Sequence, residues 1–324
     1  MLFNSTKILL ANTMMIGVIM TICSNNWISM WMGLEMSLLS FIPFLQTSNI
    51  ISSESMIKYF IMQSVASTMF LFSAVIMLIG VNMMNEMILS MAMLIKLGSA
   101  PFHNWVLMII ETMNYYTMFT MLTVLKLPPL TIMYQINSKM LIIPILLGMV
   151  MGSIFCLNQS SMRKTLGYSS IYNMSIMLTT INYYSITFMY LILYSTSLML
   201  LIKIIKNMKI NFINQMMLIE HNSFLKINLW VNMLSMGGFP PMIGFLGKML
   251  VIQIMLQKEE YLLTFILILT SMLVTAFYTR MAFTSMISYS SLKKWHSSTN
   301  YNELFVMMVN IFITPMIITL TMIF

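Results

Sequence analysis

The stretch L-I-K-L-G-S-A-P-F-H-N-W, residues 94–105, interrupts a long apolar run of the chain. It places a charged side chain, Lys96, beside two residues that end or bend helices, Gly98 and Pro101. A helix in lipid tolerates such residues only where neighbouring protein satisfies the backbone groups that they release. A charged lysine near the bilayer centre costs about 2.5–3.5 kcal/mol on insertion scales. The stretch therefore predicts an element of an ion pathway, since a costly ammonium beside a broken helix implies a use.

The composition of the chain is that of a membrane protein. Of its 324 residues, 59% are hydrophobic and 7% are charged, whereas a soluble domain carries about 25% charged residues. There are 16 Lys and Arg against 8 acids, all of them Glu. Loops rich in Lys and Arg on the inner, cytoplasmic side of a membrane explain this excess without any nucleic acid. Cys23 and Cys156 have no companion ligands, so the sequence predicts no metal site and no redox motif.

Dividing the chain at its polar clusters predicts about eleven transmembrane helices, because one crossing needs about 20 apolar residues. The predicted spans cover about 6–24, 26–46, 56–80, 83–112, 114–137, 139–157, 165–181, 184–205, 226–257, 261–288 and 302–324. The predicted fold class is thus an all-α polytopic membrane protein, with a single membrane domain over residues 1–324.

The basic residues of the loops orient this topology. With the N-terminus inside, the outside loops hold only Lys139 and Lys258. The inside loops hold Lys7, Lys58, Arg163, Lys164, Lys203, Lys206, Lys209, Lys226, Lys293 and Lys294. This bias predicts an inside N-terminus and, after an odd number of crossings, an outside C-terminus. Arg280, close to the end of its span, is interpreted as an interfacial anchor.

Four charged residues remain deep within apolar sequence: Glu35, Lys96, Lys126 and Lys248. Each lies about ten or more residues, roughly 15 Å, from the ends of its span. Left unpaired in lipid, they would together cost on the order of 10–14 kcal/mol. We interpret them as functional, with a purely structural origin as the alternative.

Two of the predicted spans, 83–112 and 226–257, share an interruption with a lysine within two turns of it. The first breaks near residues 98–101 and carries its lysine before the break, whereas the second carries Lys248 after it. The second break, near 237–241, consists of Gly237, Gly238, Pro240 and Pro241 around one phenylalanine. Interrupted segments at matching positions predict two inverted five-helix repeats, about 6–137 and 139–288, followed by a final helix, about 302–324. The alternative is two unrelated proline kinks.

His103 lies within the first break and has two interpretations that the sequence leaves open. It could relay protons, because its side chain titrates near neutral pH. It could instead hydrogen-bond the carbonyls that the break releases. No nucleophile–base pattern, phosphate loop or dinucleotide fingerprint is visible in the sequence, so we expect no cofactor-binding residues in this chain.

Five motifs, in order along the chain, together resemble one known family. They are W-M-G-L-E at 31–35, L-I-K-L-G-S-A-P-F-H-N-W at 94–105, L-K-L-P-P at 125–129, R-K-x-L-x-Y-S-S-I at 163–171 and G-G-F-P-P-x-x-G-F-x-x-K at 237–248. The pattern is similar to that of subunit 2 of mitochondrial NADH:ubiquinone oxidoreductase (complex I), within its antiporter-like subunit family. The 44 methionines fit an AT-rich, arthropod-like mitochondrial gene.

The resemblance implies roles for the four buried charges. Glu35 would pair with Lys96 of the first broken helix, Lys126 would be the connecting lysine, and Lys248 the lysine of the second broken helix. The inside would be the matrix, placing the chain in the mitochondrial inner membrane. The span at 165–181 carries no acid to match Glu35, so Lys248 has no obvious partner in this chain.

The resemblance also implies an activity and partners. The chain would be a core membrane-arm subunit of an H⁺-translocating NADH:ubiquinone reductase, contributing to proton translocation while other subunits carry the redox chemistry with FMN, iron–sulfur clusters and ubiquinone. Its partners would be neighbouring antiporter-like and small core subunits and lipids such as cardiolipin. The alternatives are a cation/proton antiporter subunit and a non-pumping structural subunit.

Overall fold

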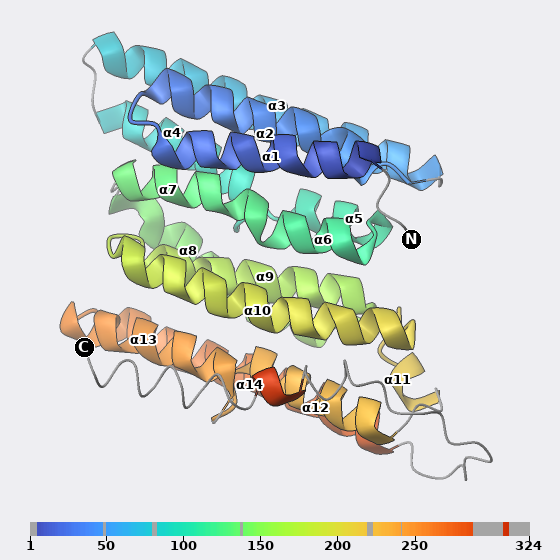
Figure 1. Cartoon of the computed structure of the whole chain (residues 1–324). Coiled ribbons are helices and arrows are strands. Elements are labelled where there is room, and N and C mark those ends of the chain that lie inside the picture. The colour runs from blue at the N-terminus through green and yellow to red at the C-terminus, as the bar shows by residue number, and fades with distance from the viewer. Residues whose placement is uncertain are drawn as a thin grey trace. The chain divides into compact units, whose positions relative to one another are not determined.

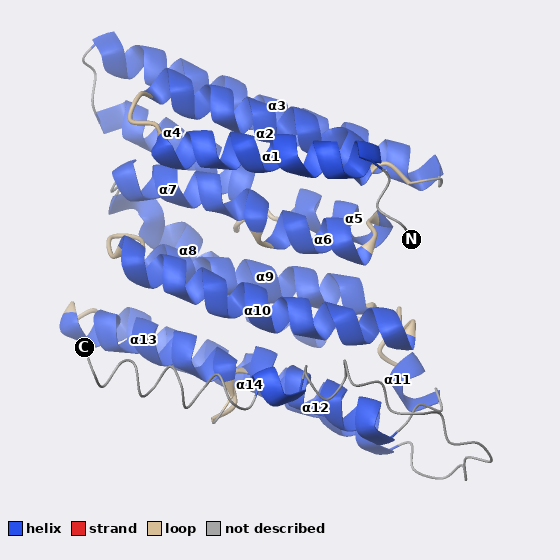
Figure 2. Ribbon diagram, viewed as in Figure 1, coloured by secondary structure: helices blue, strands red, loops and turns tan. Residues whose placement is uncertain are grey.

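The computed structural model describes residues 5–47, 50–79, 83–136, 139–218, 223–240, 242–287 and 307–310. Over these ranges the chain is helical, with no strand longer than an isolated bridge between Ser161 and Phe212 (Figure 2). The all-α prediction is therefore confirmed. Most of the predicted final helix, 302–324, lies outside the described residues.

The chain divides into two compact units, Met1–Gly148 with Ile181–Tyr184, and Met149–Thr180 with Ser185–Phe324. The first unit contains three long helices followed by shorter pieces (Figure 1). These elements are α1 (Ser5–Cys23), α2 (Trp27–Leu45), α3 (Ile50–Ile79), α4 (Met83–Leu97), α5 (Asn104–Thr112), α6 (Tyr115–Leu122), the 3₁₀ turn η1 (Val124–Lys126), α7 (Leu127–Ile136) and the 3₁₀ turn η2 (Lys139–Leu141). Helix α8 (Ile142–Leu157) continues from the first unit into the second.

The second unit is built around α9 (Met162–Thr179), which is buried along most of its length despite many Ser, Thr and Asn side chains. The other helices of this unit are α10 (Tyr184–Met208), α11 (Gln215–Leu218), α12 (Ser223–Gly237), α13 (Ile243–Gln257) and α14 (Tyr261–Ile287). Most of the Ser and Thr hydroxyls of α9 donate to the carbonyl three residues earlier, which lets a polar helix lie inside an apolar bundle.

Among the residues that the structure describes, five helices are long and apolar enough to cross a membrane by length and composition. They are Ser5–Cys23, Trp27–Leu45, Ile50–Met77, Tyr184–Met208 and Tyr261–Met286. Three other predicted spans are each divided into shorter helices, α4 and α5, α6 and α7, and α12 and α13. The sequence predicted the first and last of these divisions but treated the predicted span 114–137 as continuous, which was wrong.

Candidate functional site

The first interruption separates α4 from α5 over residues 98–103. Gly98 adopts a φ of +64°, a conformation that side chains with a Cβ rarely adopt. Its amide donates to the Ile95 carbonyl at 3.0 Å, and the Ser99 amide donates to the Leu94 carbonyl at 3.2 Å. These two bonds close the last turn of α4 and direct the chain away from the helix axis.

Neutral side chains satisfy the carbonyls that the first interruption releases. The indole Nε1 of Trp105 donates to the Ile95 carbonyl at 3.1 Å, and Gln63 Nε2 donates to the Lys96 carbonyl at 3.5 Å. A buried carbonyl without a donor would cost about 1–3 kcal/mol. The break is therefore stabilised without the ammonium of Lys96.

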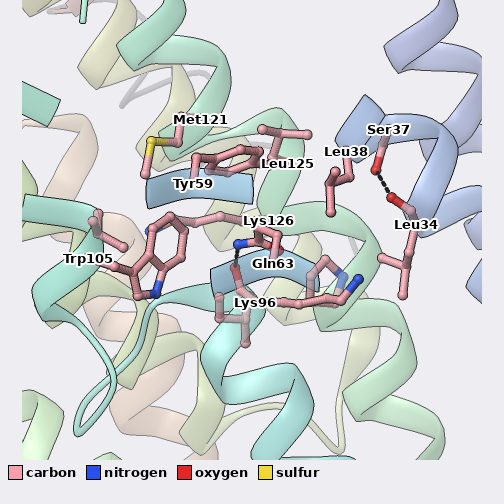
Figure 3. A pocket seen from close by; sticks show the side chains of 13 residues that line it. Leu34, Ser37, Leu38, Tyr59, Gln63, Lys96, Trp105, Met121, Leu125 and Lys126 are labelled. Carbon is pink, nitrogen blue, oxygen red and sulfur yellow. Dashed lines mark hydrogen bonds between the residues drawn. The ribbon is translucent and has the colours of Figure 1, made fainter. Parts of the chain in front are cut away.

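Lys96 and Lys126 line one cavity of about 30 Å³ (Figure 3). Only 7% of Lys96 and 4% of Lys126 are exposed. Ser37, Tyr59, Gln63 and Trp105 complete the polar part of its wall. A cavity of this size with several polar groups can hold a water molecule. The structure thus brings together two of the predicted site residues, which are separated by thirty positions in the sequence.

Glu35 lies on α2 and does not line this cavity. Its Oε1 atom is buried and accepts no hydrogen bond. Among the described residues, no ion pair joins it to Lys96. It nevertheless lies within electrostatic range of both Lys96 and the Tyr59 hydroxyl. The structure therefore gives Glu35 an electrostatic link to Lys96 rather than a direct contact.

A third interruption, missed by the sequence analysis, carries Lys126. The α6 helix ends at Leu122 and the chain passes through η1 before α7 begins. Pro128 and Pro129 have no amide hydrogen to donate to the carbonyls four residues earlier, and their rings crowd those carbonyls. The L-K-L-P-P motif contained this signal, and it places Lys126 on a tightened turn facing the cavity.

The second predicted interruption separates α12 from α13 and surrounds Lys248. Gly238 has a φ of +80°, and a Cβ added there would lie 2.8 Å from the Lys248 Nζ atom. That ammonium donates to the Gly237 carbonyl at 2.6 Å. Lys248 is 6% exposed. In this unit the lysine itself caps the broken helix.

The other neighbours of Lys248 are neutral. Its Nζ atom lies 5.8 Å from the centre of the Tyr172 ring, within the range of a cation–π interaction. A cavity of about 20 Å³ contains Lys248 with Asn173 and Tyr190, and the Tyr190 hydroxyl donates to Asn173 Oδ1 at 2.9 Å. Within the described residues, no carboxylate pairs with this lysine. The sequence analysis did not identify Asn173 and Tyr190.

His103 is buried at the start of α5, where its backbone carbonyl accepts from the Val106 amide at 3.1 Å. His103 does not line the cavity of the two lysines, and its relay and capping roles both stay predictions. No group of three or more potential metal ligands gathers in the part of the chain that the structure describes.

Comparison with known proteins shows the family of the chain. The profile of the NADH:quinone oxidoreductase/Mrp antiporter transmembrane family matches residues 24–275. The chain belongs to this family. One relative, NADH-ubiquinone oxidoreductase chain 2 of Locusta migratoria, is 34% identical over 315 residues, which cover 94% of this chain and 92% of the relative.

Two solved structures share the fold of this family member. A chain of respiratory complex I from Thermus thermophilus matches with a TM-score of 0.77 and 19% identity, covering 94% of this chain and 76% of that one. A chain of the Mrp complex from Dietzia matches with a TM-score of 0.74 and 14% identity, covering 84% and 59%. The fold of complex I and Mrp membrane subunits is thus present here.

Proposed function

We propose that the chain is a membrane-arm subunit of a complex I-type NADH:ubiquinone oxidoreductase and contributes to proton translocation. The observation that carries this proposal is the burial of three ammonium groups, Lys96, Lys126 and Lys248, each beside a helix interruption. Such groups are costly in a bilayer and commonly mark ion pathways. The relatives named as chain 2 of this oxidoreductase indicate the complex.

The shared cavity of Lys96 and Lys126 gives the first unit a means of moving a proton. A water molecule held in this cavity would connect the two lysine side chains. Glu35 lies within electrostatic range of Lys96. A change in the charge of Glu35 would therefore change how strongly Lys96 holds its proton, and a water in the shared cavity would carry that proton toward Lys126.

The finer features of the subunit follow the same proposal. About eleven crossings form two inverted repeats within a single membrane domain, with the N-terminus in the matrix and the C-terminus in the intermembrane space of mitochondria. Other membrane-arm subunits and lipids would surround the chain. FMN, iron–sulfur clusters and ubiquinone would act in neighbouring subunits, and proton movement here would respond to that chemistry through changes of charge.

Replacing Lys96 by alanine tests the proposal in the intact complex. The variant removes one of the two amines of the cavity, so we expect proton pumping per NADH oxidised to fall while the complex still assembles. Pumping in proteoliposomes and NADH oxidation are measured together. Lys203→Ala, which removes an exposed lysine of α10, is the control. Normal pumping stoichiometry in Lys96→Ala at full oxidation rate would exclude the role of Lys96.

A cation/proton antiporter subunit is the second candidate, favoured by the fold shared with the Mrp complex. A Na⁺-dependent pH gradient in vesicles that contain this chain but no NADH-oxidising subunits would support it. A purely structural subunit is a third possibility. Normal pumping after all three lysines are replaced together would identify that role.

A further inference from the structure

A cavity of about 190 Å³ lies in the second unit and shares no lining residue with the cavity of Lys248. It is far larger than the roughly 30 Å³ that one water occupies. Its buried floor is formed by Phe277 and Met281 of α14. The remaining lining residues are Leu157, Gln159, Ser160, Ile213, Asn214, Arg280 and Thr284. The cavity thus combines an apolar floor with a polar, cationic rim.

Two loops are fastened together at the rim of this cavity. Ser161 and Phe212 form an antiparallel bridge. The Ile213 amide donates to the Ser160 carbonyl at 3.0 Å, and the Met162 amide donates to the Asn211 carbonyl at 2.9 Å. These bonds fix the backbone that carries the polar rim, so the cavity has a defined shape.

Arg280 supplies the positive charge of the cavity. Among the described residues it forms no ion pair. It precedes the last residue of α14, Ile287, by about two turns, or roughly 10 Å. The 27 residues of α14 measure about 40 Å, close to the thickness of a bilayer with its headgroups. This position places the guanidinium near the boundary between headgroups and hydrocarbon.

The face of α14 that carries Arg280 is otherwise apolar and exposed. Phe265, Leu269, Met272 and Ala276 precede it at helical spacing, and all four are exposed. From Arg280 to Leu269 the helix rises about 16 Å, which matches half of the roughly 30 Å hydrocarbon core. A molecule that follows this face would meet a cation at one end and about one leaflet of apolar surface below it.

We propose that the cavity binds the phosphate headgroup of an anionic phospholipid, with Arg280 as its cationic ligand and the acyl chains along α14. A guanidinium pairs with phosphate oxygens through two parallel hydrogen bonds. The side chains of Gln159, Ser160 and Asn214 can donate to the remaining headgroup oxygens. The sequence places this rim on the inside, where Arg163 and Lys164 add to the attraction for anionic lipid.

The test uses the intact complex that contains this chain, washed in mild detergent and transferred to phosphatidylcholine nanodiscs with a minor fraction of phosphatidylglycerol. Native mass spectrometry counts the bound phosphatidylglycerol. We expect Arg280→Gln to lower its retention about tenfold, which corresponds to about 1.4 kcal/mol. Arg280→Lys keeps the positive charge but loses the paired donors of the guanidinium. Its retention of phosphatidylglycerol should lie between that of the wild type and that of Arg280→Gln.

Two controls isolate the cavity. Lys203→Gln removes an exposed lysine that does not line it, and retention should stay at the wild-type level. Ser160→Phe keeps Arg280 but fills the cavity, so retention should fall, and this variant decides the matter if Arg280→Gln does not assemble. Equal losses in Arg280→Gln and Lys203→Gln, or unchanged retention in Ser160→Phe, would overturn the proposal. Displacement of the lipid by inorganic phosphate alone would also overturn it, in favour of a site for small anions.

Discussion

The two broken helices use different groups to satisfy the backbone carbonyls that their interruptions release. In the first unit, Trp105 and Gln63 cap the released carbonyls, and Lys96 is left to face a cavity that it shares with Lys126. In the second unit, Lys248 caps the break through the Gly237 carbonyl. In the first unit, neutral side chains cap the break and the lysine does not. In the second unit, the lysine ammonium is itself the cap.

The difference extends to what surrounds each ammonium. A carboxylate, Glu35, lies within electrostatic range of Lys96, whereas Lys248 faces a carbonyl, an aromatic ring and the Asn173–Tyr190 pair. A carboxylate can change its charge by binding a proton, but these neutral dipoles cannot at physiological pH. We infer that the first unit can be switched from within the chain. The state of Lys248 must instead respond to charges that lie beyond its immediate neighbours.

Placing a carboxylate beside Lys248 in the second unit should have the largest effect on proton pumping. Asn173→Asp would place an acid in the cavity of Lys248, where it would hold the ammonium in its charged form. A charge-assisted hydrogen bond contributes about 1.5–3 kcal/mol, so proton release should slow about tenfold or more. NADH-driven pumping in proteoliposomes measures this effect. Asn173→Ser, which removes the amide without adding charge, is the control, and equal pumping in the two variants would contradict the comparison.

Removing the carboxylate of Glu35 in the first unit should have a moderate effect on coupled turnover. Glu35→Gln deprives Lys96 of its electrostatic partner without a change in size, and we expect coupled turnover to fall about two- to fivefold, as for a loss of about 0.5–1 kcal/mol. Initial rates of NADH oxidation and pumping are compared with those of Glu86→Gln, an exposed acid in the first turn of α4. If both variants match the wild type, Glu35 does not control Lys96.

The buried charges could be recognised from the sequence because an ion within apolar sequence is costly wherever the chain folds. Lys96, Lys126 and Lys248 were identified in this way, and their burial is confirmed. Gly98 and Gly238 were likewise visible as residues that interrupt helices. These predictions depend on the free energy of burying a charge or bending a helix at one position. They need no knowledge of which helices pack together.

The neighbours of the lysines could not be predicted in the same way. Asn, Ser and Tyr occur in most spans, so nothing local distinguishes Asn173 and Tyr190 from other neutral polar residues. Only the packing of α9, α10 and α13 brings these two to Lys248. The third interruption was missed for another reason. Pro128 and Pro129 stand at the start of α7, a position that proline also favours in unbroken helices.

The smallest expected effect comes from a variant that weakens the cap of the first break and leaves Lys96 unchanged. Trp105→Phe keeps an aromatic ring but removes the donor to the Ile95 carbonyl, at a cost of about 1 kcal/mol in stability. The assembled complex should therefore lose a few degrees of thermal stability while pumping per NADH stays unchanged, because Lys96 keeps its cavity. Lost pumping would mean that the Ile95 carbonyl, which keeps the Gly98 amide as a donor, now attracts the Lys96 ammonium. The first unit would then have acquired the arrangement of the second, with the lysine ammonium as the cap.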